Sequence, residues 1–208
     1  MVRSKLAALA LGSILLGACG RAPSPAFTAP PGARAISRDD AFLYVVDTDR
    51  ERLKIVNSDS QNVVAEVAVG RAPERVAVGS DETIYVTNRG SRSVSVIRKG
   101  AWREAARIPA GIEPLALTVS RDGSTLYVVN GSSELESEMG TLTAVDTRSL
   151  RIKWDLPVGA GPRDITLLEN GDALISLRVR GEAIRVDLSH PGAPRVVGRA
   201  SPVHHAAL

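Results

Sequence analysis

From residue 35 onward, apolar and polar positions alternate in short runs that recur at a nearly constant interval. Four related segments start at residues 43, 84, 126 and 174, which are 41, 42 and 48 residues apart: Leu43–Asp47, Ile84–Asn88, Leu126–Asn130 and Leu174–Arg178. Their Val, Ile and Leu residues stand in continuous or two-fold order, as in buried β-strands. No stretch shows the 3.6-residue pattern that helical repeats of similar length would need.

Each repeat unit predicts four strands separated by turns. A turn rich in Ser, Asp and Gly precedes each segment, a second and a third alternating run follow it, and a Gly-x-x-Pro motif leads into a fourth run, as at Gly70–Pro73. A period of about 40 to 45 residues with four strands is typical of one β-propeller blade. The sequence therefore predicts an all-β propeller of four-stranded antiparallel blades, with about four blades present.

The predicted organisation divides the chain into three parts. Residues 1–18 form a signal peptide, residues 19–34 a tether, and residues 35–208 the propeller repeats. We expect blades near 35–78, 79–119, 120–166 and 167–208. A closed ring usually needs about four to eight blades, and residues 198–208 resemble the blade entry at 70–78, so we expect them to open a fifth repeat and the ring to be incomplete. The alternative is a small ring in which residues 203–208 pair beside the strand near Ala35.

The N-terminus carries the signature of an exported lipoprotein. Arg3 and Lys5 precede an apolar run at 6–16, which is too short to span a membrane. The run ends in Leu-Gly-Ala-Cys at residues 16–19, which resembles the lipobox of bacterial lipoproteins and implies a lipid on Cys19. We expect a lipid-anchored protein of the bacterial cell envelope. Because Gly20 is not aspartate, the resemblance favours the outer membrane, facing the periplasm or the cell surface.

Charge and cysteine content limit the class of partner. Without residues 1–18, the chain has 24 basic and 23 acidic residues, and its arginines are scattered rather than clustered with aromatics. We therefore expect no nucleic-acid partner. Cys19 is the only cysteine, so no disulfide is expected.

The repeated strand resembles a known family. The segment Ile84-Tyr-Val-Thr-Asn88, the Ser-x-Asp-Gly turn at 120–123 and the Gly-x-x-Pro entries are similar to those of YVTN-type, YncE-like β-propellers, over residues 35–208. The resemblance implies a ring of about seven blades, which again makes this chain an incomplete ring. The fourth repeat departs from the pattern because it lacks the tyrosine.

Blade packing accounts for the repeated polar residues. We expect the rings of Tyr44, Tyr85 and Tyr127 to pack between blades, each with its hydroxyl at an edge. Asp47, Asn88 and Asn130 stand where a strand enters a hairpin, so we expect their side chains to bond the local backbone.

Residues for catalysis and cofactor binding are few. The three histidines are His190, His204 and His205, the last two adjacent on a predicted strand and so pointing to opposite faces. The chain has no haem-attachment motif, phosphate-binding loop or metalloprotease helix. Glu134, Glu136 and Glu138 could supply oxygen ligands to calcium, but a solvated loop used for partner contact is the interpretation we favour. We expect no cofactor and no bound metal.

The innermost strand of each blade lines the central channel, so residues after the Gly-x-x-Pro motifs are candidates for ligand binding. These are Arg75, Arg163, Asp164 and His204, which could hold a small anion or a peptide. Two functions stay open. We favour a membrane-tethered binding or scaffold module for a protein, peptide or surface ligand, without chemistry of its own. The alternative is the docking part of an extracytoplasmic enzyme, either a lactonase-like hydrolase or a redox protein whose haem lies on another domain.

Overall fold

The computed structural model describes residues 33–131, 139–179, 181–190 and 192–200. These residues form sixteen β-strands and one short 3-10 helix, η1 (Arg89–Ser91). No helix in this part of the chain is long and apolar enough to cross a membrane.

The strands form four antiparallel sheets, each made from four consecutive strands. Sheet 1 contains β1 (Arg34–Ile36), β2 (Phe42–Asp47), β3 (Arg52–Asn57) and β4 (Val63–Ala68). Sheet 2 contains β5 (Pro73–Val78), β6 (Ile84–Asn88), β7 (Ser93–Ile97) and β8 (Glu104–Pro109). Sheet 3 contains β9 (Pro114–Val119), β10 (Thr125–Asn130), β11 (Met139–Asp146) and β12 (Ile152–Ala160). Sheet 4 contains β13 (Pro162–Leu167), β14 (Ala173–Leu177), β15 (Glu182–Asp187) and β16 (Arg195–Ala200).

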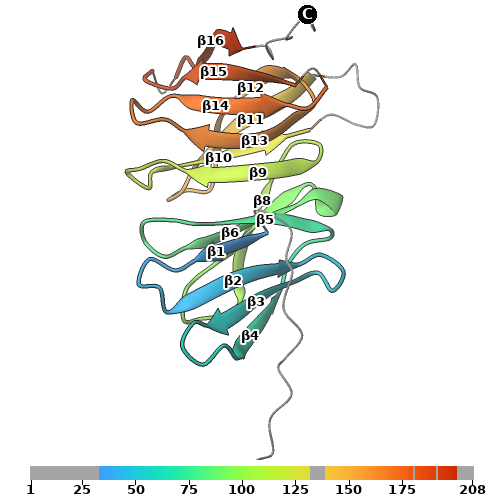
Figure 1. Cartoon of the computed structure of the whole chain (residues 1–208), viewed down its shortest axis with the longest axis vertical. Helices are drawn as coiled ribbons and strands as arrows, with labels where there is room; N and C mark the ends of the chain where they lie inside the picture. Colours follow the sequence, from blue (N-terminus) through green and yellow to red (C-terminus); the bar gives the residue numbers. More distant parts are fainter. Residues whose placement is uncertain (1–32, 132–138, 180, 191, 201–208) are drawn as a thin grey trace, which may run out of the picture.

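The four sheets are stacked in chain order, with sheets 1 and 4 at opposite ends (Figure 1). The first strands of consecutive sheets, β1, β5, β9 and β13, contact one another. Within the described ranges, no strand of one sheet pairs with a strand of another, so hydrogen bonds do not close the sheets into a ring. The predicted all-β fold of about four propeller blades is confirmed.

The sheet limits differ from the blade limits expected from the sequence. The run at 73–78, placed at the end of the first predicted blade, pairs with β6 and belongs to sheet 2. The reason is the Gly-x-x-Pro turn, which interrupts the chain between the last strand of one sheet and the first strand of the next. The following predicted limits move by one strand in the same way.

The fourth repeat is also displaced by one residue from its predicted alignment. Ala173 pairs with Val186 as Ile84 pairs with Ile97, so Ala173, not Leu174, takes the first position of the repeated strand. Leu177 lies opposite Pro162 as Asn88 lies opposite Pro73. Leu174 therefore occupies the tyrosine position and Leu177 the asparagine position.

The core lies between consecutive sheets. Tyr44 packs in the cluster that joins sheets 1 and 2, Tyr85 in the cluster that joins sheets 2 and 3, and Tyr127 against the cluster that joins sheets 3 and 4. Packing of the rings between blades is thus confirmed. The expected position of the hydroxyl is wrong for Tyr44, because its Oη is buried without a hydrogen-bond partner. Burial raises the pKa of this phenol.

The turns between the first two strands repeat their geometry even where their sequences differ. The residue that ends each turn has a positive φ: Asp40, Glu82, Gly123 and Gly171. Two of these four are not glycine, so the two strands that the turn connects hold it in a conformation that other residues adopt at a cost.

Candidate functional site

A shift in strand pairing recurs near the start of the first strand in sheets 2, 3 and 4. The pairing register shifts between Pro73 and Val76 in sheet 2, at Asn130 opposite Pro114 in sheet 3, and between Pro162 and Asp164 in sheet 4. The residue before each proline has a positive φ: Ala72, Glu113 and Gly161. Such bulges redirect side chains and are frequent beside binding sites. We call this surface the entry face, formed by residues 70–75, 88–93, 111–115 and 161–164.

Two backbone contacts tie the entry loops to the turns beside them. Arg89 N–H donates to Ala72 O at 2.9 Å, and Gly131 N–H donates to Glu113 O at 2.9 Å. The loops that carry the entry-face side chains are thereby fixed to strands of the same sheet. The scaffold is rigid where its charged groups are presented.

Arg89 links sheets 2 and 3 across the entry face. Its Nε lies 3.8 Å from Glu74 Oε2 and its guanidinium NH1 lies 3.8 Å from Glu113 Oε1. All three side chains are partly exposed, so each pair contributes only about 0–1 kcal/mol to stability. Charges of both signs therefore remain accessible to solvent at this cluster.

The structure places the predicted ligand-binding residues on two separate strands. Arg75 lies half-buried on β5, and its backbone N–H donates to Thr87 Oγ1 at 3.0 Å. Arg163 and Asp164 are exposed on β13, where Asp164 Oδ1 accepts from Ile165 N–H at 2.9 Å. Strand β9 contacts both β5 and β13, so sheet 3 stands between these groups. His204 and Cys19 lie outside the described residues, as do Glu134, Glu136 and Glu138.

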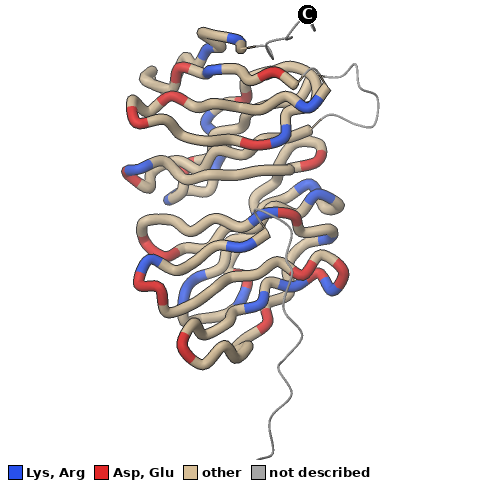
Figure 2. The backbone as a smooth tube through the Cα atoms, in the orientation of Figure 1, with Lys and Arg blue, Asp and Glu red and all other residues tan. Residues whose placement is uncertain are grey.

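Basic and acidic residues are interspersed along the described backbone, mostly in turns and at the ends of strands (Figure 2). The turns opposite the entry face hold a second bridge, in which Lys99 Nζ lies 2.7 Å from Asp39 Oδ2 and 3.4 Å from Glu82 Oε2. This bridge joins sheets 1 and 2. The hydrogen bond from Lys99 holds the pKa of Asp39 well below its usual range.

Asn88 and Asn130 form buried side-chain hydrogen bonds that were not predicted from the sequence. Both are fully buried. Asn88 Oδ1 accepts from Gly70 N–H at 3.0 Å, while its Nδ2 donates to Ser95 Oγ at 2.9 Å and to Ser93 Oγ at 3.3 Å. Asn130 Nδ2 donates to Thr143 Oγ1 at 2.7 Å and to Thr141 Oγ1 at 3.1 Å. Local backbone bonding, as expected for all three residues, occurs at Asp47, whose Oδ1 accepts from Arg50 N–H at 3.1 Å.

These asparagines explain the glycine of the Gly-x-x-Pro motif. A Cβ on Gly70 would lie 2.6 Å from Asn88 Cγ, and a Cβ on Gly111 would lie 2.8 Å from Asn130 Cγ. The repeated pairing of glycine and asparagine along the sequence could have revealed this contact. Asn88 joins sheet 2 to the end of sheet 1 through its bond to Gly70 N–H, which is a structural role, whereas the bonds of Asn130 lie within sheet 3 and its Oδ1 is buried without a hydrogen-bond partner.

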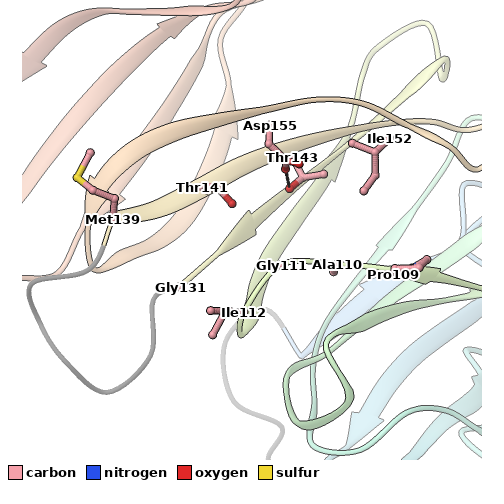
Figure 3. A pocket seen from close by; sticks show the side chains of 10 residues that line it. All are labelled: Pro109, Ala110, Gly111, Ile112, Gly131, Met139, Thr141, Thr143, Ile152 and Asp155. Carbon is pink, nitrogen blue, oxygen red and sulfur yellow. Dashed lines mark hydrogen bonds between the residues drawn. The ribbon is translucent and has the colours of Figure 1, made fainter.

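A cleft of about 390 Å³ lies beside the start of sheet 3 (Figure 3). Its polar side chains are Thr141, Thr143 and Asp155, and the Thr143 hydroxyl donates to Asp155. The rest of its lining is apolar or backbone, from Pro109–Ile112, Gly131, Met139 and Ile152. The Thr143 hydroxyl is buried and also accepts from Asn130 Nδ2 at 2.7 Å, so it belongs to the hydrogen-bond network of that asparagine.

A second cleft of about 500 Å³ lies between the turns of sheets 2 and 3. Its lining includes Asp81, Asp122 and Asp146, together with Arg98 and Arg148. Hydrogen bonds from the Ser120 and Ser124 hydroxyls lower the pKa of Asp122 to about 2. A carboxyl that is ionised at neutral pH and already hydrogen-bonded is a poor general acid.

The described residues contain no group of three or more His, Cys, Asp or Glu side chains that could hold a metal ion. His190, the one histidine among them, is exposed and lies 3.0 Å from Ser189 Oγ through Nδ1.

Comparison with known proteins supports the fold. No protein-family model matches the sequence, and no curated protein matches it. Among solved structures, hydrazine synthase from Kuenenia stuttgartiensis is similar with a TM-score of 0.74 and 25% identity, over 88% of this chain and 52% of that chain. A predicted 6-phosphogluconolactonase from Bacteroides uniformis is similar with a TM-score of 0.67 and 17% identity, over 81% of this chain and 56% of that one.

The dihydro-haem d1 dehydrogenase NirN, solved in complex with DHE, is similar with a TM-score of 0.63 and 17% identity, over 81% of this chain and 37% of that chain. The chain thus spans about half the length of the first two proteins and a smaller part of NirN. These similarities show a β-propeller fold.

Proposed function

We propose that this chain is a lipid-anchored, YVTN-type propeller module of the bacterial envelope that binds a protein or peptide partner through its entry face. The observation that carries the proposal is the cluster of Glu74, Arg89 and Glu113, held partly exposed by a rigid, bulged scaffold. Arg71 and Arg163 extend the same surface, and both are exposed. Loops on a rigid scaffold are the usual place for binding residues.

Site-specific photocrosslinking in the producing cell tests the binding face. A photoreactive residue replaces Arg71 or Arg163 on the entry face, and Arg38 or Arg121 on the turns of the opposite face serves as the matched control, since all four are exposed arginines. We expect one discrete adduct from the two entry-face positions and none from the controls. Adducts of equal yield from both faces, or none from either, would contradict the proposal.

The membrane tether is tested separately through Cys19. The Leu-Gly-Ala-Cys sequence at 16–19 supports acylation of this residue. We expect the unaltered protein to partition into the detergent phase and the Cys19→Ser variant to lose this behaviour. An unaltered protein that stays in the aqueous phase would refute the anchor while leaving the binding face open.

A second candidate function is the docking part of an extracytoplasmic enzyme. It is favoured by the similar structures, which include a predicted 6-phosphogluconolactonase and a dihydro-haem d1 dehydrogenase. Two measurements on the purified chain distinguish it: hydrolysis of 6-phosphogluconolactone above the spontaneous rate, and a stoichiometric change in the absorption spectrum of added haem. We expect neither from the binding module alone.

A further inference from the structure

Three exposed apolar side chains lie around the cleft beside sheet 3 (Figure 3). Ile112 is 38% exposed, Met139 is 60% exposed and Ile152 is 47% exposed, and all three line this cleft of about 390 Å³. Ile112 lies between β8 and β9, whereas Met139 and Ile152 begin β11 and β12. Apolar groups that line a cleft and remain accessible to solvent are typical of a site where a ligand or partner buries them.

The charged group at this cleft is a carboxylate without a basic partner. Asp155 is exposed on β12, and it accepts a hydrogen bond from the buried Thr143 hydroxyl. Among the described residues, no lysine, arginine or histidine forms an ion pair with Asp155. A carboxylate has two oxygens with about four acceptor sites, so one hydroxyl bond leaves most of this capacity unused. A negative charge and free acceptor sites therefore remain at the edge of an apolar cleft.

The same two positions form a closed ion pair in sheet 2. By strand pairing, Glu104 and Arg107 of β8 stand where Ile152 and Asp155 stand on β12. The Arg107 guanidinium donates to the Glu104 carboxylate through Nε and NH2, each at 2.9 Å. Ile152 cannot form such a pair with Asp155. Sheet 3 therefore presents an apolar side chain and a carboxylate, three residues apart, that a ligand with an aliphatic and a cationic group satisfies together.

We propose that this cleft binds a cationic, aliphatic segment of the protein or peptide partner, with a lysine or arginine side chain beside Asp155 and a neighbouring aliphatic side chain against the apolar lining. The inference rests on the proposed function, because Gly111 and Ile112 belong both to the cleft and to the entry face. The cleft volume lies within the range of about 300–1,000 Å³ that is usual for ligand pockets. It therefore suits a few side chains of an extended segment.

Two capped pentapeptides serve as probes on the full chain in uncharged lipid nanodiscs: acetyl-Ala-Leu-Lys-Leu-Ala-amide and its counterpart with glutamate in place of lysine. Fluorescence anisotropy measures their dissociation constants, with empty nanodiscs as the blank. We expect the lysine peptide to bind about threefold or more tightly than the glutamate peptide, as for an exposed ion pair. Raising the ionic strength should reduce this preference. Equal binding of the two peptides, or no saturable binding of the lysine peptide at millimolar concentration, would overturn the proposal.

Substitution of Asp155 tests the charged half of the site. Asp155→Asn keeps an acceptor for the Thr143 hydroxyl and should remove the preference for the lysine peptide, whereas Asp155→Lys should reverse it in favour of the glutamate peptide. The control is Asp59→Asn, which neutralises another exposed carboxylate in sheet 1 and should leave both dissociation constants unchanged. Urea denaturation shows whether each variant is folded. A preference that survives Asp155→Asn, or that Asp59→Asn removes equally, would contradict the proposed role of Asp155.

Substitution of Ile152 tests the apolar half. Ile152→Ser should weaken the binding of both peptides about fivefold, because their leucine side chains lose an apolar contact. Val196, at the same position in sheet 4 and 40% exposed, provides the matched control, and Val196→Ser should leave both affinities unchanged. Equal effects of the two substitutions would overturn the assignment to this cleft.

Photocrosslinking at Arg71 or Arg163 separates this inference from the proposed function. Discrete entry-face adducts together with peptide binding that does not depend on Asp155 would reject the cleft and keep the binding face. Peptide binding that depends on Asp155 without entry-face adducts would support the cleft and reject a partner bound across the entry face.

Discussion

Sheets 2 and 4 share one strand order, yet their side chains are buried in different patterns. All five residues of β6 are buried, whereas buried and exposed residues alternate along β14. The outermost strand makes the contrast stronger, because all six residues of β16 are exposed. Among the described residues, sheet 2 has a sheet on each side and sheet 4 has a sheet on one side (Figure 1). Continuous burial along a strand therefore marks a blade covered on both faces, and alternating burial marks a blade with one open face.

The largest expected difference concerns one truncation in each of the two sheets. Ile84→Ala removes a side chain that is fully buried between sheets 1 and 2, so we expect a loss of about 3 kcal/mol in the free energy of unfolding. Leu174→Ala, on the open face of sheet 4, should cost less than about 1 kcal/mol. Urea denaturation measures both. Equal losses would mean that the outer face of sheet 4 is covered in solution.

A second substitution gives sheet 2 the leucine that sheet 4 has at the position of Asn88, which is Leu177. Asn88→Leu leaves Gly70 N–H and the Ser93 and Ser95 hydroxyls without the partner they have now, and we expect a loss of about 2 kcal/mol. Adding Ser95→Ala should recover part of it, because one stranded hydroxyl is removed. If Asn88→Leu were neutral in thermal and urea unfolding, the asparagine contact would not be what joins sheets 1 and 2.

The glycine that faces Asn88 gives a smaller, steric effect. A Cβ on Gly70 would lie 2.3 Å from Ser91 Oγ and 2.6 Å from Asn88 Cγ, so we expect Gly70→Ala to cost about 1–2 kcal/mol. Gly192, with no atom within 4 Å of an added Cβ, provides the control, and Gly192→Ala should change unfolding by less than about 0.5 kcal/mol. If Gly70→Ala did not change the free energy of unfolding, the side chains of Ser91 and Asn88 would be able to move away from the added methyl group.

The smallest effect is expected at an acidic turn, where sheet 4 has Asn170 at the position of Asp122 in sheet 3. Serine hydroxyls lower the pKa of Asp122 to about 2, below the value of about 4 expected in the unfolded chain. Its stabilising contribution is therefore present above pH 4 and lost as the pH falls from about 4 to about 2. Asp122→Asn should reduce this part of the pH dependence of unfolding. An unchanged acid profile would exclude the turn as a contributor.

The sequence was sufficient for the strands whose pattern is repeated. The segments 43–47, 84–88 and 126–130 lie in β2, β6 and β10, because period-two and continuous apolar runs report burial directly. The fourth repeat was misaligned by one residue because Leu174 was matched to Leu43 by type, while strand pairing assigns that position to Ala173. The pairing of two strands depends on both of them, so it cannot be predicted from the apolar pattern of one strand.

The site was less predictable than the fold. Arg75, Arg163 and Asp164 were expected on the innermost strands and lie on β5 and β13, but only the contacts between strands show that β9 separates them. Arg89 was missed because it follows a repeated strand, and its two glutamate partners precede and follow it at unrelated distances along the chain. Contacts between sheets depend on how the blades stack, which a single repeat does not encode.

Among the described residues, no strand of one sheet pairs with a strand of the next sheet. Side-chain packing holds the sheets together and keeps water away from their amide groups. Loss of a neighbour then exposes a whole sheet at once, and a stack of this kind opens from its ends. Sheets 2 and 3, with a neighbour on each side, should retain deuterium-resistant amides longest, while sheet 4 exchanges first. The exchange rates of sheets 1 and 4 therefore report separately on what covers each end of the stack.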